Sequence, residues 1–196
     1  MIREFQLADF FTLANAACGM ACVLLAMRHM AEPELGVFLC ASALVVAALI
    51  CDVFDGRVAR ARNQHSAFGR ELDSLADIVS FGVAPAALAY AAGMQGGWDG
   101  LILVYFVCCG VSRLARFNVT ADALSAGADK VRYFEGTPIP TSVLLVVGLA
   151  VAVWQGHQGS ALLAWPIGPW LLHPLVLLFA LSGSLMISKS LRIPKF

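Results

Sequence analysis

This chain carries four aspartates in two short stretches, Cys51-Asp52-Val53-Phe54-Asp55-Gly56-Arg57-Val58-Ala59-Arg60 and Gly69-Arg70-Glu71-Leu72-Asp73-Ser74-Leu75-Ala76-Asp77. Asp52 and Asp55 are spaced i, i+3, and Asp73 and Asp77 are spaced i, i+4. At these spacings both members of a pair lie on the same face of a helix. The two stretches therefore predict two helices, each of which presents a pair of carboxylates on one side.

A turn near Asn63 and Gln64 would make the two helices an antiparallel hairpin. Asp52 then lies about as far before the turn as Asp73 lies after it, roughly 15 Å at 1.5 Å per residue. The two pairs would meet at one depth and repel each other. Hard oxygen ligands suit Mg²⁺, Mn²⁺ or Ca²⁺, which would offset this repulsion. Four aspartates are enough to hold two ions that keep open positions for a phosphate.

Two other interpretations of the aspartates remain open on the residues alone. The aspartates would form ordinary salt bridges at a solvated helix end if they paired with Arg57, Arg60, Arg62 and Arg70. Acidic residues within membrane helices also form cation or proton paths in transporters. The second interpretation assigns the chain to a different functional class.

The composition is that of a membrane protein. Of the 196 residues 60% are hydrophobic and 13% are charged, whereas soluble domains carry about 25% charge. Six apolar runs predict an all-α polytopic protein with six transmembrane helices, although several runs are slightly shorter than the roughly 20 residues that a spanning helix needs. We expect a single domain over residues 1–196 and a short amphipathic segment at Met1–Asp9. The runs are Phe10–Met27, Leu35–Ile50, Ile78–Met94, Trp98–Val111, Ile139–Trp154 and Trp170–Ile187.

The distribution of lysine and arginine predicts the orientation. The loops at Gly93–Gly100 and Gln155–Pro169 contain neither residue, and only Arg28 falls on their side. The loops that follow the second and fourth predicted helices, and both ends of the chain, are rich in them. Positive loops stay in the cytoplasm. We therefore expect both termini and the four aspartates on the cytoplasmic side of an inner membrane. A net charge of zero gives no reason to expect a nucleic-acid partner.

The spacing Asp-x-x-Asp-Gly-x-x-Ala-Arg, eight residues, then Gly-x-x-x-Asp-x-x-x-Asp is matched without a gap from Asp52 to Asp77. This pattern resembles the signature of the CDP-alcohol phosphotransferases. Three further stretches resemble the subgroup of that family that uses serine as its acceptor. They are Glu71–Pro85, Arg113–Val119 and Tyr133–Pro140.

The resemblance implies an enzyme that transfers the phosphatidyl group of CDP-diacylglycerol to an alcohol and releases CMP. It implies that Asp52, Asp55, Asp73 and Asp77 bind two divalent cations, Mg²⁺ or Mn²⁺, and that Asp77 is also the general base. It further implies a homodimer in the lipid bilayer. The residues implied to hold the nucleotide part are Thr12, Asn15, Gly56, Ala59, Arg60, Ser66 and Gly69.

The acceptor expected from the resemblance is L-serine, and glycerol 3-phosphate or an inositol phosphate is the alternative. Serine carries a carboxylate and an ammonium group, so its pocket needs a cation. Candidate acceptor residues are Arg113, Arg116, Asn118 and Lys130. The basic residues among them also fit a simpler explanation, namely positive-inside topology or contact with anionic lipids.

Overall fold

The computed structural model describes residues 6–61, 67–125, 133–188 and 192–194. Within these residues the chain forms six helical segments, four of them long, and two small antiparallel pairs of strands. One pair is β1 Tyr133–Glu135 with β4 Arg192–Pro194, and the other is the hairpin of β2 Trp165–Ile167 and β3 Trp170–Leu172. The third helical segment is continuous but changes its winding, because a π-helix joins α3 to α4. The helices are α1 Leu7–Ala31, α2 Leu35–Ala61, α3 Ala67–Asp77, the π-helix Ile78–Val83, α4 Ala84–Ala91, α5 Gly97–Ser125, α6 Val143–Trp154 and α7 Leu177–Ile187.

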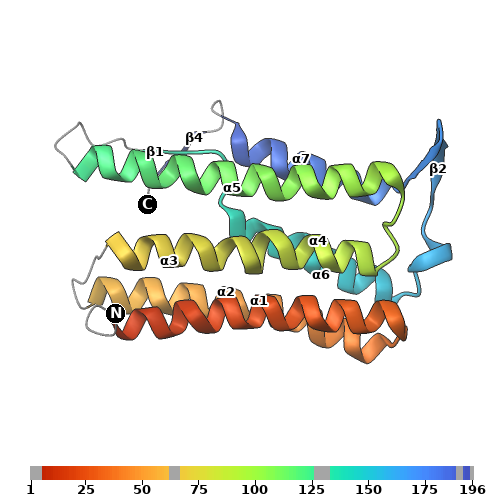
Figure 1. Ribbon diagram of the computed structural model, residues 1–196, viewed down its shortest axis with the longest axis horizontal. Helices are drawn as coiled ribbons and strands as arrows, with labels where there is room; N and C mark the ends of the chain where they lie inside the picture. Colours follow the sequence, from red (N-terminus) through yellow and green to blue (C-terminus); the bar gives the residue numbers. More distant parts are fainter. Residues whose placement is uncertain (1–5, 62–66, 126–132, 189–191, 195–196) are drawn as a thin grey trace.

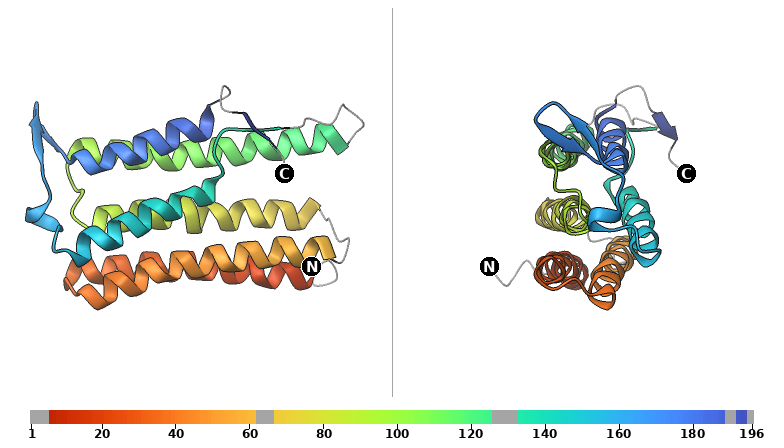
Figure 2. Two further views of the ribbon diagram at one scale, coloured as in Figure 1. Left: turned by 180° about the vertical axis from the view of Figure 1, so that it is seen from behind. Right: turned by 90° about the vertical axis from the view of Figure 1, so that its right-hand side faces the viewer.

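The helices lie along one axis in two layers (Figures 1 and 2). Seen end-on in Figure 2, one layer contains α1, the α3–α4 segment and α5, and the other contains α2, α6 and α7. Large side chains that are fully buried fill the space between the layers, and Phe106 of α5 meets Phe179 of α7 edge to face at 5.3 Å. Helix α6 packs on α2 and α4, and Figure 1 shows that it does not extend along α3.

Four helices are long and apolar enough to cross a membrane, and two shorter helices are also apolar. The expectation of an all-α membrane protein with six helices is therefore confirmed. The four long candidates are Ala8–Ala31, Leu35–Val58, Phe68–Ala91 and Gly97–Thr120, and the shorter ones are Ile139–Trp154 and Pro174–Ile187.

The sixth predicted helix begins later than the sequence suggested. Trp170–Leu172 is strand β3, which pairs with β2, Trp165–Ile167, around Gly168, whose φ is +62°. Glycine tolerates this left-handed conformation without strain. The expected amphipathic segment also differs, because α1 already begins at Leu7, and residues 1–5 lie outside the described part.

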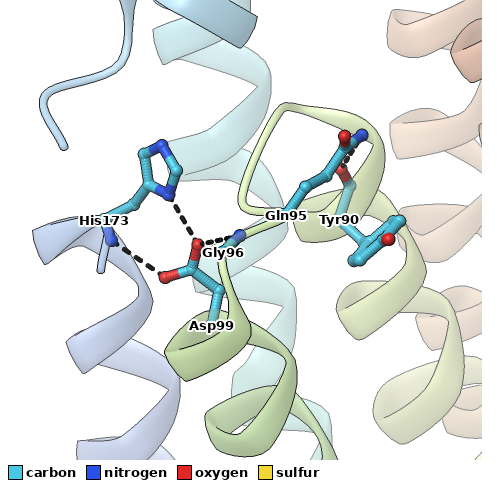
Figure 3. A network of polar contacts seen from close by, with 5 residues as sticks. All are labelled: Tyr90, Gln95, Gly96, Asp99 and His173. Carbon is cyan, nitrogen blue, oxygen red and sulfur yellow. Dashed lines mark hydrogen bonds and ion pairs between the residues drawn. The ribbon is translucent and has the colours of Figure 1, made fainter. Parts of the chain in front are cut away.

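The β2–β3 hairpin marks one end of the bundle, here called the hairpin end, and a buried polar network holds this end together (Figure 3). Asp99 is fully buried near the start of α5 and accepts hydrogen bonds from the backbone N–H groups of Gly96 and His173, both at 2.8 Å. The same carboxylate contacts Nδ1 of the His173 ring at 2.5 Å. This network holds His173, which precedes α7, against the start of α5.

The third helical segment approaches α1 very closely through its π-helical part. A Cβ atom added to Gly19 of α1 would lie 2.7 Å from Cα of Ser80, so only glycine fits there. The Ser80 hydroxyl donates to the carbonyl oxygen of Asn15 at 2.8 Å. The π-helix ends just before Pro85, and prolines, which lack an N–H group, disrupt the regular helical ladder. The π-helical part thus brings α1 close to the segment that carries Asp77.

We expect the substitution Asp99→Ala to lower the free energy of unfolding by about 1–3 kcal/mol, because it leaves the buried N–H of His173 and the part-buried N–H of Gly96 without an acceptor. Unfolding in detergent, followed by tryptophan fluorescence, measures this change. The matched control is Glu34→Ala. The Glu34 side chain is 62% exposed and lies 3.9 Å from Arg28, so its loss should cost about 0–1 kcal/mol. Equal effects of the two substitutions would contradict the role of the buried network.

Candidate active site

Three of the four predicted aspartates form a tight cluster at the end of the bundle opposite the hairpin end. Asp52 and Asp55 from α2 and Asp73 from α3 each offer a carboxylate oxygen, and these oxygens lie within 4.8 Å of one another. Asp55 is buried, whereas Asp52 and Asp73 are half-buried. The two acidic stretches therefore meet side by side, as their spacing predicted. We call Asp52, Asp55 and Asp73 the carboxylate triad.

Asp77 lies one helical turn beyond Asp73, at the last residue of α3. It is buried, and its carboxylate interacts electrostatically with all three members of the triad. It is not among the three residues whose oxygens meet within 4.8 Å. A neighbour on α1 contacts it, because Nδ2 of Asn15 donates to Oδ1 of Asp77 at 3.2 Å. The structure thus divides the four aspartates into a cluster of three and a separately held fourth.

Helix α1 supplies the polar contacts that orient these carboxylates. The Thr12 hydroxyl donates to Oδ2 of Asp55 at 2.9 Å, and Asn15 donates to Asp77 from one turn further along α1. Thr12 and Asn15 are both buried. The sequence placed these two residues near a nucleotide, and the structure places each of them against an aspartate.

The oxygen atoms of the triad fit a divalent cation. Carboxylate oxygens bind Mg²⁺ at about 2.0–2.1 Å and Ca²⁺ at about 2.3–2.6 Å, so two ligands of one ion can lie some 4–5 Å apart. Oδ1 of Asp73 is buried and has no hydrogen-bond partner within the described residues. The same holds for Oδ1 of Asn15 beside Asp77. Buried acceptors without a donor are costly, and a cation would satisfy them.

The residues predicted to hold a nucleotide lie near the triad on α2 and α3. Gly56 follows Asp55 directly, and a Cβ atom added to it would lie 3.5 Å from the guanidinium group of Arg60, an ordinary contact. Gly69 lies one turn before Asp73 on α3. Ala59 belongs to α2, but its side chain lies outside the described part, as does the whole of Ser66.

The candidate acceptor residues of α5 separate into two groups. Arg113 is half-buried and interacts electrostatically with Asp77, whereas Arg116 donates to the carbonyl oxygen of Ile187 at the end of α7, at 3.2 Å. Asn118 is buried and contacts α3. Lys130 lies outside the described residues. Arg113 and Asn118 therefore face the acidic segment, and Arg116 is tied to α7.

Sequence reasoning missed four residues that shape this region: Glu71 and Ser74, which bond to Asn118, and Gly19 and Ser80, which let α1 approach. A weak signal was present for one of them, because Gly19 follows Asn15 by four residues and thus shares its helix face. The partners of Glu71 and Ser74 lie on α5, more than 40 residues away in the sequence, and no local pattern reveals them.

A family model described as CDP-alcohol phosphatidyltransferase matches residues 5–180, and this chain belongs to that family. The curated relatives include three enzymes named CDP-diacylglycerol–serine O-phosphatidyltransferase. The one from Saccharomyces cerevisiae is 42% identical over 203 residues, which cover 100% of this chain and 72% of the relative. Those from Mycobacterium leprae and Mycobacterium bovis are 36% and 34% identical, and they align with 89% and 88% of this chain. The chain spans 56% and 58% of the length of these two mycobacterial relatives.

We expect Thr12→Val to weaken binding of Mn²⁺ by about 10–100-fold, the usual effect of removing a hydrogen bond to a metal ligand. Valine nearly preserves the volume of threonine but leaves Oδ2 of Asp55 without its donor. Electron paramagnetic resonance of free Mn²⁺ measures the affinity. Thr120→Val is the matched control, because the Thr120 hydroxyl is exposed and bonds only to the carbonyl oxygen of Arg116 in its own helix. Unchanged affinity in Thr12→Val would contradict the assignment.

Proposed function

We propose that this protein transfers the phosphatidyl group of CDP-diacylglycerol to the hydroxyl of L-serine, giving phosphatidylserine and CMP. The observation that carries the proposal is the carboxylate triad with Asp77 held beside it, in a chain that belongs to the CDP-alcohol phosphatidyltransferase family. Three relatives similar over most of this chain bear the name of the serine-specific enzyme, which supports serine as the acceptor.

The reaction exchanges one phosphorus–oxygen bond for another. The serine hydroxyl oxygen forms a bond to the phosphorus that carries the diacylglycerol group, and the bond from that phosphorus to the oxygen of CMP breaks. Asp77 accepts the hydroxyl proton as the new bond forms, which a carboxylate can do because the proton becomes acidic in the transition state. Asn15 orients Asp77 for this task through the hydrogen bond to Oδ1.

The four aspartates would hold two divalent cations, Mg²⁺ or Mn²⁺, with the triad supplying most of the ligands. Bound cations would neutralise charge on the diphosphate and on the departing CMP. The chain itself holds the carboxylates in position. Thr12 orients Asp55 through a hydrogen bond, and the antiparallel arrangement of α2 and α3 sets the distances between the other carboxylates. A site on a helix face also leaves the acyl chains of the lipid in the bilayer.

The nucleotide part would lie over the residues of α2 and α3 that surround the triad, with the guanidinium of Arg60 as a donor to phosphate. On the acceptor side, Arg113 is the cation best placed, because it interacts with Asp77. An inner-membrane location with both termini in the cytoplasm, and assembly as a homodimer, remain predictions from the charge distribution and the family resemblance.

Purified protein in detergent should release CMP when it is given CDP-diacylglycerol, Mn²⁺ or Mg²⁺, and L-serine. Chromatography of CMP and mass spectrometry of the lipid product measure the reaction. Parallel assays with glycerol 3-phosphate and with an inositol phosphate identify the acceptor. CMP release with one of these and not with serine would contradict the proposal and reassign the acceptor. Removal of divalent ions with a chelator should stop the reaction, and added Mn²⁺ should restore it.

Asp77→Asn should lower the rate of serine-dependent CMP release by about 100- to 10,000-fold, the usual contribution of a general base. Asparagine keeps an oxygen that can accept from Asn15, so the packing of α1 on α3 should persist. The matched control is Glu32→Gln, an exposed acidic residue that follows α1 at the hairpin end. If Asp77→Asn retained full activity, Asp77 would not be the base.

A further inference from the structure

Helices α3 and α5 are joined by a small polar cluster that the chemistry described above does not use. Nδ2 of Asn118 donates to Oε2 of Glu71 at 3.1 Å and lies 3.0 Å from Oγ of Ser74. The Ser74 hydroxyl in turn donates to Oδ1 of Asn118 at 3.2 Å. Asn118 is buried, whereas Glu71 is exposed. We call these three residues the Asn118 clamp; it fixes the Glu71 carboxylate at the outer edge of the contact between α3 and α5.

The Asn118 clamp lies next to Asp77, the proposed base, along the helical segment. Ser74 lies three residues after Glu71 and Asp77 lies three residues after Ser74, so each is a neighbour of the next on the surface of the helical segment. On α5, Arg113 lies five residues before Asn118 and interacts with Asp77. The facing sides of the two helices thus carry an anion, Glu71, near the end of the bundle and a cation, Arg113, deeper beside Asp77.

Arg113 has a donor that the described residues leave unused. Its Nε atom is buried and has no hydrogen-bond partner there. A buried guanidinium donor without an acceptor is unfavourable, so a bound anion would stabilise it. Arg116, one turn further along α5, differs because it donates to the carbonyl oxygen of Ile187. The available cation on this side of α5 is therefore Arg113.

The backbone positions of the two charged residues are spaced on the scale of a small zwitterion that makes a contact at each end. Asp77 lies six positions after Glu71 and Asn118 lies five positions after Arg113, which corresponds to roughly 8 Å along the helix axes at 1.5 Å per residue. Two charge-assisted hydrogen bonds of about 2.8 Å each would occupy much of this distance. A small zwitterion such as an α-amino acid, whose ammonium and carboxylate groups are close together, therefore suits this spacing.

We propose that Glu71 and Arg113 select the acceptor by its two charges, an inference that rests on the proposed function. Glu71 receives the ammonium group of serine, Arg113 binds the serine carboxylate, and the hydroxyl is left beside Asp77. Asn118 and Ser74 are positioning residues that hold Glu71 in place. The same carboxylate repels acceptors that carry a phosphate and no ammonium group, so the clamp also provides discrimination against them.

The decisive variant is Glu71→Gln, because glutamine keeps an oxygen for Asn118 and removes only the charge. We expect kcat/KM for serine to fall by about 10–100-fold, the loss of one hydrogen bond between charged groups, mainly through a higher KM for serine. The KM for CDP-diacylglycerol, measured in the same CMP-release assay, separates the two explanations. A general disturbance of α3 would raise both KM values, whereas loss of the ammonium contact raises the KM for serine alone.

Two further variants complete the test. Glu71→Asp, which keeps the charge on a shorter side chain, should give a KM for serine between those of the unaltered protein and Glu71→Gln. Glu32→Gln at the hairpin end should change neither KM. Glu71→Gln with an unaltered KM for serine, with both KM values raised together, or with a loss of kcat alone would overturn the inference. If the unaltered protein released no CMP with serine, the proposed function itself would fail.

Discussion

The structure depends on keeping like-charged carboxylates close together in a mostly apolar bundle. Without a counter-charge such groups repel one another, and burial makes each of them costly. Helix α1 lowers this cost because it provides donors at two successive turns, Thr12 for Asp55 and Asn15 for Asp77. Those donors reach the carboxylates only because α1 runs very close to the π-helix, where Gly19 meets Ser80. A packing contact between small residues thus supports the electrostatics of the site.

The two ends of the bundle are built for different tasks. At the hairpin end, Asp99 satisfies the backbone of Gly96 and His173, and Trp98 donates to the carbonyl oxygen of Ile167 at 2.9 Å, so the polar groups there bond to one another. At the acidic end, oxygen atoms of Asp73 and Asn15 and the Nε of Arg113 have no partner in the described residues. The Asp99 network at the hairpin end is thus satisfied internally, whereas the acidic end presents groups suited to ions and ligands.

The sequence predicted most of what local spacing can encode. The pairs Asp52–Asp55 and Asp73–Asp77 identified two helix faces, and an antiparallel hairpin was enough to bring three of the four side chains together. Apolar runs located the helices but could not distinguish the β2–β3 hairpin from the start of a helix, because Trp170 and Leu171 are as apolar as the residues that follow. Gly168-Pro169 was placed at the end of a predicted loop, but the sequence reasoning did not identify it as the turn of a strand hairpin.

Such local patterns could not predict contacts between segments that are distant in the sequence. Thr12 and Asn15 were singled out, but their partners among the aspartates depend on how α1 packs. Glu71 stands inside the quoted motif, and only its bond to Asn118 of α5 distinguishes it from an ordinary exposed acid.

The π-helix between α3 and α4 allows the two halves of one membrane helix to face in different directions. An α-helix turns by about 100° per residue, so one extra residue in a turn rotates everything beyond it by roughly that angle. Asp73 and Asp77 can therefore face α1 and α2, while Leu88 and Ala89, further along the same segment, are fully buried in the core. A one-residue deletion within Ile78–Val83 would restore regular winding and misalign one half of the helix with its neighbours, so the length of this segment is itself a functional element.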